Sequence, residues 1–212
     1  MLGDEVHTSL RVRGALPVAG VVLAAGLSSR MGRNKLLFDL GGEPVVRRSV
    51  RAALAAGLDP ILVVLGHDAR AVRAALASLP CRFVVNPRYA DGMNSSVCTG
   101  VSALPPDVPA AVVLLADMPF VDADMVATLV AQYRCGNARL VASEYGGVFA
   151  PPTLVDRSLF AELASEAGNG CGKRLRRRHA DEAATVSWPA TALADLDVPE
   201  DYERAKARLA TS

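Results

Sequence analysis

Residues 18–35 read VAGVVLAAGLSSRMGRNK, an apolar run followed at once by a loop of glycine, serine and basic residues. Such a run is typical of a buried parallel strand, and the loop after a strand is a common place for phosphate binding. Gly26 and Gly32 free the backbone to take positive φ and let a ligand approach its N–H groups, while Arg30 and Lys35 supply cations for anionic oxygens. The stretch predicts a triphosphate-binding loop, and on composition alone an ordinary strand-to-helix turn is an equal alternative.

Two common nucleotide-binding fingerprints are absent from this loop. No Gly-Lys-Ser/Thr closes it as in a Walker A loop, and it contains no Gly-x-Gly-x-x-Gly. The sequence therefore disfavours both the P-loop folds and the dinucleotide-binding folds.

Length and composition indicate a globular protein with a small ligand. The sequence is 51% hydrophobic and 21% charged, with a mean hydropathy of +0.25, which is typical of a globular protein. Its 212 residues are enough to bury a full hydrophobic core. A formal net charge of +1 favours neither nucleic acid nor an anionic membrane as partner. The opening lacks a long apolar run, so we expect a flexible tail over residues 1–16 and a single domain over residues 17–212.

The cysteine pattern points to a cytoplasmic protein. Cys81, Cys98, Cys135 and Cys171 are dispersed and form no Cys-x-x-Cys pair. This spacing argues against a structural zinc site and against a disulfide framework, and it favours free thiols in a reducing compartment.

Apolar runs alternate with amphipathic segments along the chain. Strands are expected near residues 18–25, 60–66, 82–86, 110–116 and 139–143, with a short extended piece at 36–40. Helices are expected near residues 44–56, 68–79, 95–103 and 122–134 and after Pro199, and Asp68 is suited to cap the second of them. Strands and helices in this order connect by right-handed crossovers into a doubly wound, mixed but mainly parallel sheet with helices on both faces. The ligand crevice then lies at the carboxyl ends of the strands.

Polar residues follow three of these segments. Asn86 and residues 92–96 follow the third strand, where Asn94 or Ser95 is suited to cap the next helix. Asp117 follows the most apolar run, and one carboxylate there suffices for Mg²⁺, which completes its octahedron with water and phosphate oxygens. Capping the following helix is the alternative role, but Asp122 serves it equally well. Asp197 precedes Pro199, where a helix cap is the simpler interpretation.

Residues 23–32, together with Lys35, resemble the signature of the nucleotidyltransferases that activate sugar phosphates, methylerythritol phosphate and molybdopterin. Within that superfamily the resemblance is strongest to the MobA/MocA-like group, and in particular to its molybdenum cofactor cytidylyltransferase branch. Three further landmarks recur in order, namely NPRYADGMNSS at 86–96, LLADMP at 114–119 and DLDVPEDY at 195–202. The resemblance covers about residues 18–207.

The resemblance implies a Rossmann-like nucleotidyltransferase fold and a Mg²⁺-dependent transfer of CMP from CTP to the phosphate of molybdopterin, with release of pyrophosphate. It makes Arg30, Lys35 and Asp117 catalytic, and Asp117 and Asp197 metal ligands. It also implies a transient contact with a molybdoenzyme that receives the product, or with that enzyme's chaperone. The residues implied in nucleotide binding are Leu23, Ala24, Ala25, Gly26, Ser28, Arg30, Met31, Gly32, Lys35, Asn86, Gly92, Ser95, Ser96 and Asp117.

Several alternatives stay open. Guanylyltransferases of this group generally carry glycine where this chain has Ala25, so the alanine methyl favours the smaller base of CTP over that of GTP. Residues 150–152 read Ala-Pro-Pro where relatives usually have Gly-His-Pro, and residues 168–173 read GNGCGK where relatives tend to have Gly-Asp-x-Gly-Ala-Arg. A GTP-dependent enzyme and a sugar-phosphate nucleotidyltransferase share most of the motifs and stay open, and the altered segments also leave room for a non-catalytic nucleotide-binding chaperone.

Two expectations concern single basic groups. Lys35 is expected in solvent, where it contributes little to stability. The dense basic run at residues 173–179 is typical of a solvated helix face, and attraction of an anionic acceptor is the functional alternative.

Overall fold

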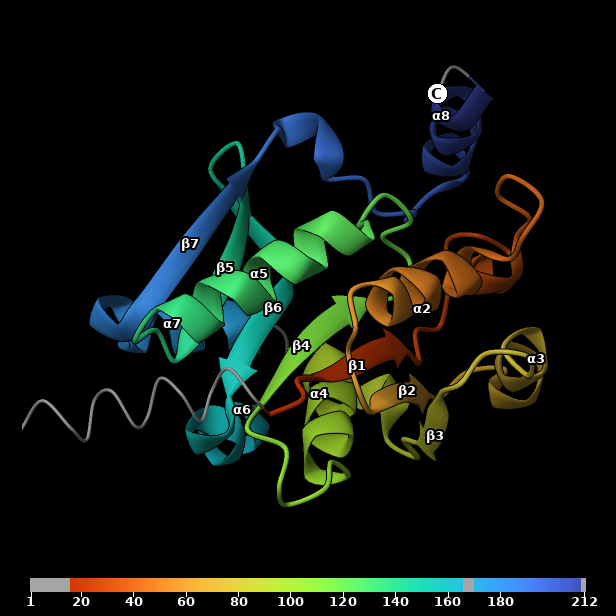
Figure 1. The fold of residues 1–212 in the computed structure, drawn as a ribbon. Coiled ribbons are helices and arrows are strands. Elements are labelled where there is room, and N and C mark those ends of the chain that lie inside the picture. Colours follow the sequence, from red (N-terminus) through yellow and green to blue (C-terminus); the bar gives the residue numbers. More distant parts are fainter. Residues whose placement is uncertain (1–15, 166–169, 211–212) are drawn as a thin grey trace, which may run out of the picture.

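The computed structural model describes residues 16–165 and 170–210, so the expected tail lies almost wholly outside the described residues. Within these ranges seven strands form one sheet in the order β3-β2-β1-β4-β6-β5-β7 (Figure 1). The strands are β1 Ala19–Ala24, β2 Ile61–Leu65, β3 Arg82–Val85, β4 Ala110–Leu115, β5 Leu140–Tyr145, β6 Val148–Asp156 and β7 Ala183–Trp188.

The predicted mixed, mainly parallel sheet is confirmed. β1 runs parallel to β2 and β4, and β2 runs parallel to β3. β6 is antiparallel to both β4 and β5, and β5 is parallel to β7. The sheet therefore has a parallel half, β3-β2-β1-β4, and a second half that begins at the reversed strand β6.

Helices cover both faces of the sheet, as the doubly wound fold requires. The helices are α2 Val45–Ala55, α3 Ala69–Ala75, α4 Met93–Ser102, α5 Ala123–Cys135, α6 Phe160–Ser165, α7 Cys171–Arg178 and α8 Pro199–Ala210. Side chains of α2, α3 and α5 share one buried cluster with Val22 and Ala24 of β1. Side chains of α4, α6 and α7 share the opposite cluster with Val21 and Leu23, so alternate residues of β1 face opposite layers.

The C-terminal helix α8 packs beside the loop that follows β1. Leu196 and Ala205 share a third buried cluster with Met31, Phe38 and Val45. The end of the chain therefore closes over the segment that the sequence analysis singled out (Figure 1). Among the described residues, no helix combines the length and the apolar character needed to cross a membrane.

Four local expectations were wrong. Lys35–Leu37 forms a 3₁₀ turn instead of an extended piece, because Asn34 Oδ1 accepts from the N–H of Leu36 at 3.1 Å. α3 ends at Ala75, and Asp68 makes no side-chain cap, since its backbone is left-handed with φ 53°. α4 begins directly after Gly92, whose φ is 106°, so Asn94 and Ser95 lie inside the first turn and do not cap it.

β6 and β7 were not predicted. β5 and β6 form a hairpin instead, and β7 joins its outer edge. One helix cap was predicted correctly, because Asp122 Oδ1 accepts from the N–H of Met125 at 2.9 Å at the start of α5.

Candidate active site

A groove of about 390 Å³ lies at the carboxyl ends of β1 and β4. The loop after β1 forms one wall, residues from the start of α4 form another, and Asp117 and Asp197 also line the groove. It is lined by Leu23, Ala25, Gly26, Leu27, Ser28, Ser29, Arg30, Lys35, Leu36, Tyr89, Ala90, Gly92, Met93, Ser96, Leu115, Asp117 and Asp197. The position agrees with the crevice expected for an open α/β sheet.

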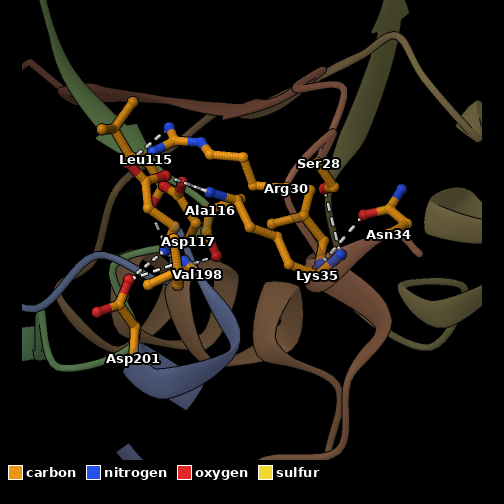
Figure 2. Close-up of polar contacts among 12 residues, drawn as sticks. Ser28, Arg30, Asn34, Lys35, Leu115, Ala116, Asp117, Val198 and Asp201 are labelled. Carbon is orange, nitrogen blue, oxygen red and sulfur yellow. Dashed lines mark hydrogen bonds and ion pairs between the residues drawn. The ribbon is translucent and has the colours of Figure 1, made fainter. Parts of the chain in front are cut away.

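A cluster of four charged side chains occupies one end of the groove. Lys35 Nζ lies 2.6 Å from Asp117 Oδ2 and 2.9 Å from Asp197 Oδ1. Arg30 Nη2 donates to the other oxygen of Asp197 at 3.2 Å. Figure 2 shows the Lys35 and Arg30 side chains extending from the loop toward Asp117. The cluster joins two cations to two carboxylates, so its charges balance.

The ion pairs shift two pKa values in opposite directions. Burial disfavours the charged form of Lys35, but the attraction of Asp117 and the hydrogen bonds to Asp117 and Asp197 outweigh it, so the pKa of Lys35 is raised above its ordinary value. The hydrogen bond from Lys35 lowers the pKa of Asp197 against the effect of burial, with help from Arg30. Both shifts favour the ionised pair at neutral pH.

The 3₁₀ turn places Lys35 inside the groove. Ser28 Oγ accepts from the N–H of Lys35 at 3.2 Å, and the backbone reverses through Ser28 (φ 51°) and Gly32 (φ 69°). Lys35 is only 8% exposed, so the expectation of a solvent-exposed loop lysine was wrong. Gly26 has no positive φ, but the space around its Cα is open to a ligand.

Asp201 frees Asp197 to face the groove. Asp201 Oδ2 accepts from the N–H groups of Asp197 and Val198 at 2.8 and 2.9 Å, so Asp201 occupies the backbone donors at the start of α8. Figure 2 shows these two bonds. Asp197 was the residue expected in that role and Asp201 was not predicted, although an acid in the first turn of a helix is a recognisable signal.

Asn86 holds the start of α4 from behind the groove. It is 1% exposed, and its Nδ2 donates to Ser95 Oγ at 2.8 Å and to Ser96 Oγ at 3.0 Å. Its Oδ1 accepts from the N–H of Arg88 at 2.9 Å. Ser96 and Gly92 line the groove, whereas Asn86 and Ser95 do not. Asn86 and Ser95 therefore reach a ligand only through the residues that they position.

Three other residues implied in nucleotide binding lie away from the groove wall. Ala24 is buried in β1, and Met31 packs in the cluster beside α8. Gly32 is exposed and forms the turn of the loop. The remaining implied residues line the groove together, namely Leu23, Ala25, Gly26, Ser28, Arg30, Lys35, Gly92, Ser96 and Asp117.

Three residues that shape the groove, Gly66, Tyr89 and Met93, were not predicted from the sequence. A Cβ on Gly66 would lie 2.6 Å from Tyr89 Cβ and 2.8 Å from Ala25 Cβ, so only glycine lets these two groove walls meet. A glycine placed directly after a buried strand was the available signal. Tyr89 and Met93 both line the groove.

A second cavity, of about 450 Å³, adjoins the first. The two share Leu23, Met93 and Leu115 as lining residues. Residues of β5, β6 and α7 form the far walls, including Ala150, Pro151 and residues 170–173. Ala150, Pro151 and residues 170–173 belong to the segments whose sequence departs from that of the MobA/MocA-like group, so most of these departures meet at this cavity. Positions 168 and 169 lie outside the described residues.

The donor set of the groove fits a magnesium ion. Mg²⁺ takes oxygen ligands and is commonly held by one or two carboxylates, with water and substrate phosphate completing the octahedron. The carboxylates of Asp117 and Asp197 both contact Nζ of Lys35. Within the described ranges, no group of three or more His, Cys, Asp or Glu side chains could hold a metal ion by itself. A metal here would depend on a bound phosphate for further ligands.

Comparison with known proteins places the chain among nucleotidyltransferases. Residues 20–183 match the protein-family model described as MobA-like NTP transferase domain. The nicotine blue oxidoreductase of Paenarthrobacter nicotinovorans is 31% identical over 166 residues, covering 74% of this chain and 80% of that protein. The probable molybdenum cofactor guanylyltransferase of Natronomonas pharaonis is 30% identical over 201 residues, covering 90% of this chain and 97% of that protein. The solved structure of Rv0371C from Mycobacterium tuberculosis H37Rv in complex with manganese is 25% identical, covers 91% of this chain and 99% of that chain, and has a TM-score of 0.77.

Proposed function

Because this chain belongs to the MobA-like NTP transferase family, we propose that it transfers CMP from CTP to the phosphate of a molybdopterin-type acceptor in a Mg²⁺-dependent reaction. The observation that carries this proposal is the charged cluster of Lys35, Arg30, Asp117 and Asp197, which lies in a groove that adjoins a second cavity. The groove suits a nucleotide, and the adjoining cavity suits the acceptor.

The proposed reaction is an in-line displacement at the α-phosphorus. An oxygen of the acceptor phosphate forms a new bond to the α-phosphorus, the bond from that phosphorus to the bridging oxygen of the β-phosphate breaks, and pyrophosphate leaves with the electron pair. Lys35 and Arg30 would bind the triphosphate oxygens, and Asp117 and Asp197 would hold Mg²⁺. When bound, Mg²⁺ would neutralise charge on the phosphate oxygens. Positioning and charge stabilisation are the main contributions a protein makes to such transfers.

The preference for CTP rests on Ala25. This residue is 4% exposed and lines the groove beside Gly66 and Tyr89, so its methyl group reduces the space near the loop backbone. One methyl group is worth about 1 to 3 kcal/mol, so CTP should be preferred over GTP by about ten-fold to a few hundred-fold. Ala25→Gly should reduce this ratio, because it restores room for a purine.

GTP is the second candidate donor, because one of the relatives is a probable molybdenum cofactor guanylyltransferase. The test is pyrophosphate release by the purified protein with molybdopterin and either triphosphate, with and without Mg²⁺, with Ala25→Gly run in parallel. CTP should give the higher kcat/KM. Equal efficiency with GTP, or an unchanged ratio in Ala25→Gly, would contradict the cytidylyl assignment. Release only with a sugar phosphate as acceptor would contradict the molybdopterin assignment.

We place this reaction in the cytoplasm. All four cysteines are free in the structure, as expected in a reducing compartment. A dinucleotide product must then reach its molybdoenzyme, so a transient contact with that enzyme or its chaperone forms part of the proposal.

A further inference from the structure

The second cavity has mainly apolar walls and a cationic edge. Leu23, Val97, Val113, Leu163 and Phe149 contribute apolar walls. Lys173 and Arg176, three residues apart on α7, line it as well, and residues at this spacing lie on one helix face.

The basic run on α7 divides into two sets. Arg178 and His179 are paired with Glu162 of α6, and these contacts anchor the end of α7. Lys173 and Arg176 form no ion pair with any residue in the ranges 16–165 and 170–210. Arg177 is exposed and does not line the cavity. Lys173, Arg177 and Arg178 are exposed, as expected for a solvated helix face, but Lys173 also borders the cavity together with the half-buried Arg176.

Arg176 is held in a fixed orientation without an anionic partner. Its guanidinium carbon lies 3.7 Å from the ring centroid of Phe149, which is a stacking contact. Its Nε is buried and has no hydrogen-bond partner among the described residues. The guanidinium group of Arg176 therefore borders the cavity without a carboxylate partner among the described residues, which favours an anionic group on the ligand.

These cations lie apart from the phosphate chemistry. The acceptor phosphate must reach the α-phosphate in the groove, where Arg30 and Lys35 already provide two cations. Lys173 and Arg176 line only the second cavity. A single phosphate on the acceptor therefore leaves their charge unexplained.

We propose that the acceptor carries a second anionic group, distinct from its attacking phosphate, and that Arg176 and Lys173 bind this group while Phe149 and its apolar neighbours contact the body of the molecule. This inference rests on the proposed function, because it assigns the second cavity to the acceptor. The class of acceptor is a phosphorylated heterocycle with an electron-rich edge, and the ene-dithiolate of a molybdopterin belongs to it. A phosphorylated sugar without a further anionic group does not belong to this class, because the apolar walls would leave its hydroxyl groups without hydrogen-bond partners.

The test compares two acceptors and three proteins. The acceptors are molybdopterin and the same molecule methylated on both sulfurs, which keeps the phosphate and loses the anionic edge. The proteins are the wild type, Arg176→Ala and the matched control Arg177→Ala, each checked for folding by circular dichroism. Anaerobic binding is followed by pterin fluorescence, and KM is measured separately for the acceptor and for CTP.

Wild type and Arg177→Ala should bind the dithiolate form at least ten-fold more tightly than the methylated form. Arg176→Ala should lose about ten- to 150-fold in affinity for the dithiolate form, the range of a hydrogen bond to a charged group, and should discriminate little between the two forms. The KM for CTP should not change, and Arg176→Lys should recover part of the affinity. If the ratio of the affinities for the two acceptors is the same in Arg176→Ala as in the wild type, the inference is overturned, while the proposed function stays intact. Binding of CTP without binding of either acceptor by the wild type would overturn both.

Discussion

At the scale of single residues, the site depends on one buried ammonium group between two carboxylates. Lys35 meets Asp197 across 162 positions of sequence, and it meets Asp117 from the end of a different strand. The motif around residues 23–35 predicted Lys35 as functional, and the carboxylate directly after the apolar run 110–116 predicted Asp117. Their pairing could not be predicted, because it depends on how α8 closes against the loop after β1.

Replacing Lys35 by methionine should reduce pyrophosphate release by about one to two decades. Methionine keeps the approximate length of the side chain and removes the charge, and a lost charge-assisted contact costs about 1.5 to 3 kcal/mol. The variant should also unfold at lower urea concentration, because both carboxylates lose their buried counter-ion. Arg33→Met is the matched control, since Arg33 packs over Phe38 outside the groove. A folded Lys35→Met protein with wild-type turnover would remove Lys35 from the mechanism.

Asp117→Asn should remove most of the dependence of the rate on Mg²⁺ concentration. The amide keeps the shape of the carboxylate and loses the charge that attracts the cation. The rate is titrated with Mg²⁺ at saturating CTP for the wild type, for Asp117→Asn and for Asp124→Asn, whose acid lies in the first turn of α5 outside the groove. If the curves for the wild type and Asp117→Asn coincide, Asp117 is not a metal ligand.

At the scale of elements, α4 sets one wall of the groove by packing very close to the sheet. A Cβ on Gly100 would lie 2.5 Å from Val21 Cγ1 and 3.0 Å from Val64 Cγ2. The helix therefore has no room to accept a larger residue there, and its first turn carries Gly92 and Ser96 into the groove. The position of that wall therefore depends on Gly100, which does not line the groove itself.

Gly100→Ala should lower the free energy of unfolding by about 1 to 3 kcal/mol, because the added methyl group overpacks the core. It should also raise the KM for the nucleotide, since α4 must shift. Gly172→Ala on α7 is the control, because an added Cβ meets nothing within 4 Å. That change should be neutral or should add about 0.5 to 1 kcal/mol to stability. Urea unfolding measures both, and equal stability of the two variants would contradict the close packing of α4.

Elements with continuous apolar sequence were predictable, including β5, whereas β6 and β7 in the second half of the sheet were not. β1, β2 and β4 are buried on both faces, so their runs are plain in the sequence. β6 contains Pro151 and Pro152, and β7 is an edge strand with alternating exposure, so neither has an uninterrupted apolar run. The second cavity lies largely in this half, which explains why its residues were the least predictable part of the site.

At the scale of the whole molecule, the link between α8 and the groove makes folding stability depend on pH. Lys35 holds the pKa of Asp197 below its ordinary value. A group with a lowered pKa contributes stability above its unfolded pKa, and this contribution is lost as the pH falls through the folded pKa.

Asp197→Asn should therefore be less stable than the wild type at pH 7. The difference should stay below about 1 kcal/mol, because the side chain of Asp197 is 41% exposed and water screens the pair. It should be constant down to about pH 5 and should shrink below about pH 4, near the ordinary pKa of aspartate. Urea unfolding of both proteins from pH 7 to pH 3 measures it, and a difference that grows on acidification would contradict the assigned ion pair.

The reversal of direction between β4 and β6 has a consequence for how the protein can evolve. The nucleotide groove is built on the parallel strands, whereas most of the second cavity is built on β5, β6 and α7. Substitutions in β5, β6 and α7 can reshape the second cavity without replacing any residue of the loop after β1 or of its ion pairs. Under the proposed function, a lineage can therefore change its acceptor by substitutions on one side of this boundary while purifying selection keeps the triphosphate-binding residues on the other side.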